Sequence, residues 1–248
     1  MQAQKKIKET DAIFERLSQL NPAADRADDV LRLSLDAKAA VKIGLFSRGG
    51  KSRGEKQAAD HDFQPEQVWT PYGIFLPRFD DLYLYFTSSA VTSDCIVDLL
   101  DRWWRAVRQR FAGVKTLVIN QDNGPENQSR RTQFLKRMVE FAYNHALLVQ
   151  LAYYPPYHSK YNAIEHCWGV LENHWNGEIL DDVEAMLGFA RSMTWNGNHP
   201  VVEVVSGVYP KGVRLSVREM KLVEAQVERL PSLGKWFVDI PGHKPRLG

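Results

Sequence analysis

The sequence has few cysteines and no long apolar run, and each shortage excludes a class of protein. Its two cysteines, Cys95 and Cys167, can build neither a disulfide framework nor a four-thiolate zinc site, so we expect a reducing, intracellular compartment. No stretch approaches the roughly 18 apolar residues of a membrane span, and residues 1–10 are polar and lack an apolar signal core. We therefore expect a protein that is neither secreted nor inserted in a membrane.

The sequence also has little net charge. Its formal charge is +2, whereas a simple nucleic-acid-binding domain is strongly basic, so net charge does not decide the partner. It contains no internal repeat and no low-complexity tract. What it does contain is 44% hydrophobic and 11% aromatic residues over 248 positions, which is enough for a globular core.

The hydrophobic pattern predicts a series of strands. Val30 to Asp36 alternates apolar and polar residues before its terminal acid, and 39–46 is expected to continue in an extended form. Two β-rich runs, 68–76 and 82–87, are separated by Pro77-Arg78-Phe79-Asp80-Asp81, which suggests a hairpin. Two nearly continuous apolar strands follow at 116–120 and 147–153.

Helical spacing of apolar residues predicts the remaining elements. A short helix from Asp11 to Leu20 is expected to end at Asn21-Pro22, and a helix capped by Ser93 buries two tryptophans. Further helices are predicted over 134–142, 162–175, 182–193 and 217–229. The helical spacing of Trp168 and Trp175 in the second of these favours packing in the core over stacking on bases. Because strands and helices alternate in the middle of the chain, the sequence predicts an α/β fold with parallel strands buried on both faces.

Three carboxylates lie at special places on this scaffold. Asp36 ends the first strand, Asp122 follows the strand 116–120, and Glu165 lies in the first turns of a helix. If the two strands are parallel neighbours, their terminal carboxylates can share an ion, and Glu165 can complete the site. Clustered Asp and Glu oxygens suit Mg²⁺, and two such ions suit phosphodiester chemistry.

Each acid also has an ordinary structural explanation. Asp122 precedes Asn123-Gly124 and fits a turn, Asp36 fits a turn at a strand end, and Glu165 suits the positive end of a helix dipole. Glu172, seven residues after Glu165 on the same helix face, is the main rival for the third acid. No single acid decides between these interpretations.

At these residues the sequence resembles the DDE-type transposases of the ISAzo13 family of bacterial insertion sequences, distant relatives of the IS630 and Tc1/mariner enzymes. The resemblance runs from about Thr10 to Ile240. It is carried by the segments 33–38, 61–63, 70–74, 117–127 and 154–168, of which the last is the most specific: Tyr-Pro-Pro-Tyr-His-Ser-Lys-Tyr-Asn-Ala-Ile-Glu-His-Cys-Trp.

The resemblance implies an RNase H-like fold: a mixed sheet with helices on both faces and a C-terminal helical extension. It also implies an Asp36, Asp122 and Glu165 triad that holds two Mg²⁺ or Mn²⁺ ions for DNA cleavage and strand transfer. DNA would be the partner, with a homo-oligomer assembled on it in the bacterial cytoplasm, near the nucleoid. The expected parts are a leader with a short helix (1–29), the catalytic domain (30–200) and an extension packed on it (201–248).

Such transposases usually carry an N-terminal helix-turn-helix region, for which there is no room before Asp36. A truncated copy, a decayed element and an isolated catalytic domain therefore stay open. Two other functions also stay open: a DNA-binding remnant without activity, and an RNase H-like nuclease that acts on RNA–DNA hybrids.

Several basic residues are candidates for contact with the DNA backbone. A basic, glycine-rich segment after the first strand contains Arg48, Lys51 and Arg53; its spacing does not fit a phosphate-binding loop. Arg130 and Arg131 follow Asp122, and Lys160 precedes Glu165 by five residues. The histidines 158, 166 and 174 are too widely spaced for a zinc site.

Overall fold

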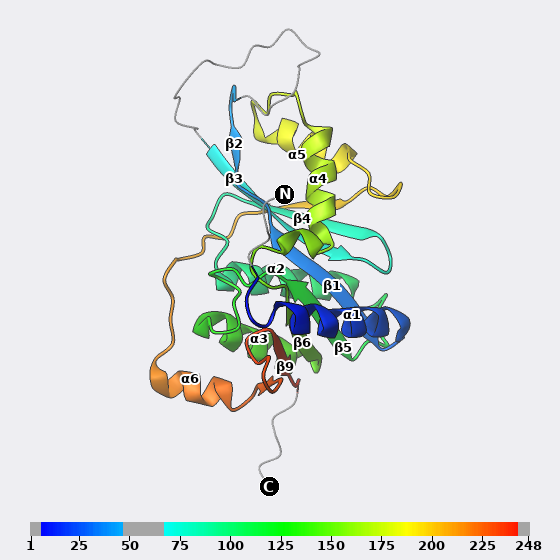
Figure 1. The fold of residues 1–248 in the computed structure, drawn as a ribbon. Coiled ribbons are helices and arrows are strands. Elements are labelled where there is room, and N and C mark those ends of the chain that lie inside the picture. The colour runs from blue at the N-terminus through cyan, green and yellow to red at the C-terminus, as the bar shows by residue number, and fades with distance from the viewer. Residues whose placement is uncertain (1–5, 47–66, 243–248) are drawn as a thin grey trace.

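The computed structural model of the chain describes residues 6–46 and 67–242. Within these residues, a nine-stranded mixed sheet forms the centre of the molecule (Figure 1). The strands are β1 (Val30–Ala37), β2 (Val41–Ile43), β3 (Gln67–Leu76), β4 (Asp81–Thr87), β5 (Thr116–Gln121), β6 (Leu148–Tyr153), β7 (Val201–Val205), β8 (Glu228–Arg229) and β9 (Phe237–Ile240). Their order in the sheet is β7-β4-β3-β1-β5-β6-β9-β8, and β2 pairs with β3.

The helices are α1 (Thr10–Arg26), α2 (Ser93–Val107), α3 (Thr132–His145), α4 (Ile164–His174), α5 (Val183–Ser192) and α6 (Val217–Glu224), with a 3-10 turn, η1 (Ser159–Tyr161). In Figure 1, α1 crosses one face of the sheet and α2 and α3 cover the other. None of the helices in the described part of the chain is long and apolar enough to cross a membrane.

The central strands have the directions that the sequence predicts. β1, β5 and β6 are parallel, and β3 and β4 form the antiparallel hairpin next to β1. Leu31, Leu33 and Leu35 of β1 are buried in the same core cluster as the helix residues of α2 and α3. The residues between them point to the opposite face, because side chains alternate along a strand. The predicted α/β fold is therefore confirmed.

The predicted end of α1 at Asn21-Pro22 is wrong, since the helix continues to Arg26 with Pro22 inside it. A proline removes one helix hydrogen bond, which usually ends a helix. Here tertiary contacts compensate. Asn120 donates to Asn21 (3.1 Å), and the Arg32 guanidinium donates two hydrogen bonds to Asp25 (2.8 and 2.6 Å). These contacts tie the last turns of α1 to the sheet.

Two further boundaries differ from the prediction. Thr92, not Ser93, caps α2 by accepting from Cys95 N–H, while the Ser93 hydroxyl donates to the Glu126 carbonyl (2.6 Å). The predicted helix 217–229 ends at Glu224, because Glu228 and Arg229 pair with β9 as the edge strand β8. Local periodicity carries no information about such pairing with a distant strand.

The segment beyond residue 200 contributes strands as well as a helix. β7 pairs in parallel with β4 at one side of the sheet, and β9 pairs antiparallel with β6 at the other. Val205, Val223, Trp236 and Phe237 are buried in the same core cluster as α1 and β1. The predicted boundaries at residues 30 and 200 stay a prediction, although both terminal segments share one core with the rest.

Candidate active site

Asp36 and Asp122 lie at the carboxyl ends of two neighbouring strands. The parallel pairing of β1 with β5 ends with Ser34 opposite Asn120, and each acid follows two residues later. Because side chains two residues apart point to the same face of a strand, both carboxylates share a face as well as an edge. The structure thus confirms the strand arrangement from which a shared site was predicted.

Glu165 reaches this edge from α4. It lies in the first turn of the helix, and the backbone N–H of its neighbour Ile164 donates to the Ser34 hydroxyl (2.9 Å). One turn on, the Trp168 indole N–H donates to Asp36 Oδ2 (3.1 Å). Residues three apart share a helix face, so the face of α4 that contacts Asp36 also carries Glu165.

The negative charges of the other two carboxylates act on Asp36. Burial, followed by the negative charges of Asp122 and Glu165, raises the pKa of Asp36 from 3.8 to about 7. The groups that lower this pKa are the Ala37 backbone N–H and the Trp168 indole, and both are uncharged. Asp36 is therefore a half-buried acid whose negative charge is poorly compensated by the protein itself.

The donor chemistry of this site fits a hard divalent cation. Three carboxylates supply only oxygen ligands, and a cation would relieve the repulsion that raises the Asp36 pKa. Within residues 6–46 and 67–242, however, no three His, Cys, Asp or Glu side chains lie close enough together to hold a metal ion.

A glycine makes room for α4 beside Asp36. Gly73 of β3 is paired with Asp36, and a Cβ atom at this position would lie 2.9 Å from two ring carbons of Trp168 and in contact with the end of Ile164. The sequence prediction assigned Trp168 to the core, which is correct because it is 4% exposed. The hydrogen bond of Trp168 to Asp36 was not predicted, because it joins residues 132 positions apart in the sequence.

The loop after β5 is held by Asn127. Its side-chain NH₂ donates to the Asp122 carbonyl (3.1 Å), to Asp122 Oδ1 (3.4 Å) and to Gln121 Oε1 (3.1 Å). The Asn127 carbonyl in turn accepts from the Tyr153 hydroxyl of β6 (2.7 Å). Asp122 therefore lies in a loop that side-chain hydrogen bonds anchor to the sheet, and the turn itself begins only at residue 125.

Glu172, the rival for the third acid, is engaged elsewhere. Its carboxylate forms an ion pair with Lys38 at 2.7 Å. Glu172 is absent from the charges that raise the Asp36 pKa, whereas Glu165 is among them. The structure therefore favours Glu165 over Glu172 as the acid that joins Asp36 and Asp122.

The basic candidates differ in their surroundings. Arg130 and Lys160 are exposed and follow the carboxyl ends of β5 and β6, respectively. Arg131 is mostly buried and paired with Glu126 (3.2 Å), so much of its charge is compensated within the protein. Arg48, Lys51 and Arg53, together with the segment 61–63, lie outside the described residues.

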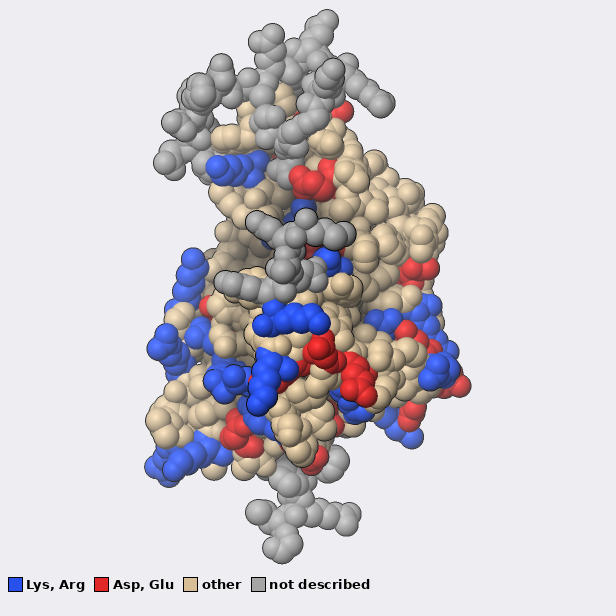
Figure 2. All heavy atoms as spheres, in the orientation of Figure 1, with Lys and Arg blue, Asp and Glu red and all other residues tan. Residues whose placement is uncertain are grey.

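The surface supports a local rather than a global role for charge. In Figure 2, Lys and Arg side chains gather over the lower half of the molecule, where Figure 1 places α3 and α6, and Asp and Glu lie among them. Some cations of the described residues are paired, such as Arg137 of α3, which contacts Asp94 and Asp98 at 2.6 Å. A contact with DNA therefore has to be argued for individual cations.

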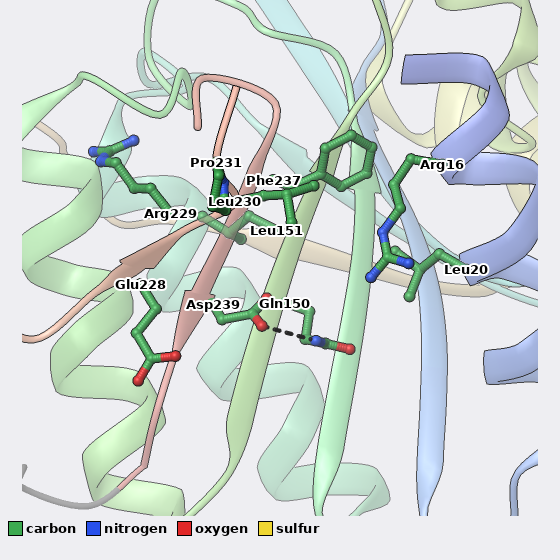
Figure 3. Close-up of a pocket in the computed structure, with 10 residues that line it drawn as sticks. All are labelled: Arg16, Leu20, Gln150, Leu151, Glu228, Arg229, Leu230, Pro231, Phe237 and Asp239. Atoms are coloured by element: carbon green, nitrogen blue, oxygen red, sulfur yellow. Dashed lines mark hydrogen bonds between the residues drawn. The ribbon is translucent and has the colours of Figure 1, made fainter. Parts of the chain in front are cut away.

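The cysteines and a hollow near α1 lie apart from this site. Burial raises the pKa of both Cys95 and Cys167 to about 12, which keeps the thiols protonated and unsuited to metal binding. A hollow of about 190 Å³ lies between α1 and strands β6 and β9, where Arg16 faces Gln150 and Asp239 (Figure 3). None of the three predicted acids lines it.

Comparison with known proteins points to one family. A family model described as Rhodopirellula transposase DDE domain matches residues 1–241, whereas no curated protein matches the chain. Among solved structures, the Mos1 transposase paired-end complex with the left transposon end is similar, with a TM-score of 0.51 and 11% identity. This similarity covers 76% of the present chain and 56% of the Mos1 chain.

A second Mos1 structure, the mariner paired-end complex with Mn, has a TM-score of 0.49 at 12% identity and covers 76% of this chain and 56% of that one. The present chain thus matches little more than half the length of these transposases. At such low identity the first similarity shows the fold alone, which is RNase H-like.

Proposed function

This chain belongs to the Rhodopirellula transposase DDE-domain family, and on that premise we propose that residues 30–200 form a catalytic domain that cuts and joins DNA strands. The observation that carries the proposal is the placement of Asp36 and Asp122 at the carboxyl ends of two parallel neighbouring strands, with Glu165 in the first turn of the helix that contacts Asp36. Carboxylates gathered at one edge of a sheet, one of them with a raised pKa, are typical of functional sites, since folding alone gives no reason to gather them.

We assign Asp36, Asp122 and Glu165 to the binding of two Mg²⁺ or Mn²⁺ ions. When bound, such ions activate the attacking oxygen and stabilise the leaving oxygen of a phosphodiester. The protein would orient the ligands: Trp168 donates to one oxygen of Asp36, and Asn127 holds the loop that carries Asp122. The reactions would be hydrolysis at a transposon end and attack of the freed 3'-hydroxyl on target DNA.

The test compares two acids on one helix. Glu165→Gln should lower Mg²⁺-dependent strand cleavage by at least about 10²-fold, the scale of one lost electrostatic contact to a transition state. Glu172→Gln is the matched control: it changes the same functional group two turns further along α4 and should leave cleavage at the level of the unchanged protein. Equal activity of the two variants would remove Glu165 from the site.

A strand-transfer assay and a Mg²⁺ titration separate the two rival functions. A nuclease of the RNase H type would cleave RNA–DNA hybrids and yield no strand-transfer product. A DNA-binding remnant would show no Mg²⁺ binding in titration calorimetry that depends on the three carboxylates. Strand transfer together with carboxylate-dependent metal binding is the result that the proposal requires.

We propose DNA as the partner, with Arg130 and Lys160 contacting its phosphates beside the carboxylates, in the cytoplasm and on a homo-oligomer. Each single alanine substitution should weaken binding alike for all DNA sequences and reduce the slope of log affinity against log salt by about 1. Lys115→Ala is the control, because this exposed lysine directly precedes β5, at the opposite edge of the sheet. An equal effect of Lys115→Ala would contradict the assignment.

A further inference from the structure

A buried polar cluster joins the strand that carries Asp36 to the start of the helix that carries Glu165. The Ser34 hydroxyl donates to Asn162 Oδ1 (2.5 Å), and the Asn162 amide donates to the Leu35 carbonyl (2.9 Å). Both side chains are almost inaccessible to solvent, at 0% exposed for Ser34 and 1% for Asn162. Their partners are separated from them by more than a hundred residues in sequence.

This cluster also provides the N-terminal cap that α4 lacks. The residue at the N-cap position is Ala163, whose side chain cannot accept a hydrogen bond. The first backbone N–H groups of a helix have no partner within it, and here the Ile164 N–H donates to Ser34 Oγ (2.9 Å). A strand residue thus replaces the local capping side chain, so the position of Ser34 in β1 determines where the first turn of α4 lies.

The connection continues to the third acid. The Glu165 backbone N–H donates to the Asn162 carbonyl (3.0 Å), while the Asn162 side chain is bonded to the carbonyl of Leu35, the residue before Asp36. Two hydrogen bonds therefore link the backbones of Glu165 and β1 through one asparagine. Ser34 and Asp36 point to the same face of β1, so the cluster lies next to Asp36 on that face of the sheet.

Apolar packing alone would not fix the position of the start of α4 relative to β1. Hydrophobic contact is non-directional, so the packing of Ile164 and Trp168 against Gly73 limits the distance between α4 and the sheet but does not by itself fix which backbone groups of the helix start face β1. Hydrogen bonds depend on distance and angle, and a buried polar group that loses its partner is costly, so the cluster admits one position of the helix start. The cluster therefore matters for the position of α4 more than for the free energy of its packing on the sheet.

We propose that Ser34 and Asn162 are positioning residues that set the place of Glu165 relative to Asp36 and so determine how tightly the site binds a divalent ion. This inference rests on the proposed function, because it assumes that the three acids hold metal. Neither side chain would touch the metal or the DNA; both act through the backbone of α4. Outer groups of this kind typically change metal affinity by about 10- to 100-fold.

The experiment measures Mn²⁺ affinity by titration calorimetry, together with the thermal stability of the metal-free protein. Ser34→Ala and Asn162→Ala should each weaken Mn²⁺ binding by about 10- to 100-fold. The matched control is Ser129→Ala, which removes another buried serine hydroxyl (1% exposed) that donates to the Lys235 carbonyl at 2.8 Å. It should lower stability in the same way and leave Mn²⁺ affinity unchanged.

A milder variant keeps the test decisive if an alanine variant does not fold. Ser34→Cys nearly preserves volume but replaces the hydroxyl with a weak hydrogen-bonding thiol, so it should fold and still bind Mn²⁺ less tightly. Ser34→Thr keeps the hydroxyl, so its Mn²⁺ affinity should stay closer to that of the unchanged protein than the affinity of Ser34→Cys does. Unchanged affinity in Ser34→Cys and Asn162→Ala, or an equal loss in Ser129→Ala, would overturn the inference.

Failure of the proposed function gives a different result. If the unchanged protein binds no Mn²⁺, or binds it equally well after Asp36→Asn, the three acids are not a metal site and both proposals fall. If the unchanged protein binds Mn²⁺ through Asp36 and the Ser34 and Asn162 variants bind it equally well, only the positioning role is refuted.

Discussion

Replacing Asp36 with asparagine is expected to abolish strand cleavage and, at the same time, to stabilise the metal-free protein at pH 8. Cleavage should fall by roughly 10³-fold or more, at the upper end of the effect of one electrostatic contact. Asparagine keeps an oxygen that can accept from Trp168, so the hydrogen bond to α4 survives the substitution. The gain in stability comes from removing a negative charge that is half-buried among other negative charges.

The sign of this effect follows from the pKa of Asp36, which is about 7 in the folded protein against 3.8 for an ordinary aspartate. Between these values the folded state binds more protons than the unfolded state, so stability falls as pH rises from about 4 to about 7. Above pH 7 the loss is complete. Since one pKa unit corresponds to about 1.4 kcal/mol, Asp36→Asn should raise the free energy of unfolding at pH 8 by about 2–4 kcal/mol.

Thermal denaturation at pH 5 and pH 8, with and without Mg²⁺, checks this prediction. In a chain of this size, the gain corresponds to a rise in Tm of roughly 5–10 °C at pH 8, with a smaller difference at pH 5. Mg²⁺ should stabilise the unchanged protein but not Asp36→Asn, because only a protein that binds an ion is stabilised by it. A lower Tm of Asp36→Asn at pH 8 would show that Asp36 is not held among uncompensated charges.

An exposed acid serves as the control for charge removal in general. Asp28 is 97% exposed in its ion pair with Arg78, and exposed pairs of this kind contribute about 0–1 kcal/mol. Asp28→Asn should therefore change neither the pH dependence of stability nor the response to Mg²⁺. A similar rise in Tm for both variants would point to net charge rather than to the site.

Much of the scaffold could be predicted from the sequence because the apolar and polar pattern of each strand reflects which of its faces are buried. Alternation in β1 and the continuous apolar run of β5 reflect burial on one or both faces, and an acid directly after each run marks the carboxyl edge of the sheet. Neighbouring parallel strands place these ends at the same edge of the sheet, whatever the conformation of the connecting loops. The approximate positions of Asp36 and Asp122 therefore follow from local pattern plus fold class.

The remaining features depend on contacts between distant segments. α1 continues past Pro22 because Asn21 and Asp25 bond to strand residues, and β8 exists because β9 lies beside it. In the same way, the hydrogen bond from Trp168 to Asp36 spans 132 positions. No window of neighbouring residues contains such information, so periodicity predicted Trp168 as core and could not assign its polar contact.

Gly73→Ala is expected to damage the site without changing any candidate ligand. The backbone of Gly73 is not in the left-handed region, so space rather than conformation excludes a side chain there. An added methyl group would lie 2.9 Å from the rigid Trp168 ring and would push α4 away from β1. Overpacking of this kind costs about 1–3 kcal/mol, and a displacement of about 1 Å at a reacting centre can cost 10²-fold in rate.

The measurements are strand cleavage, Mn²⁺ affinity and thermal stability of Gly73→Ala. Gly169→Ala is the control, because it adds the same methyl group to α4 itself at an exposed position with no atom within 4 Å of the new Cβ. That change should raise stability slightly, by up to about 1 kcal/mol from helix propensity, and leave cleavage unaltered. Full cleavage activity in Gly73→Ala would show that the contact of α4 with the sheet does not govern the site.

A double variant separates the two contacts of the new methyl group. Ile164→Val removes the terminal carbon that the added Cβ would touch, whereas the contact with Trp168 remains. In Gly73→Ala combined with Ile164→Val, stability should therefore recover in part while cleavage and Mn²⁺ affinity stay low. Recovery of all three would place the damage in packing at Ile164, and would argue that the hydrogen bond from Trp168 to Asp36 tolerates the shift.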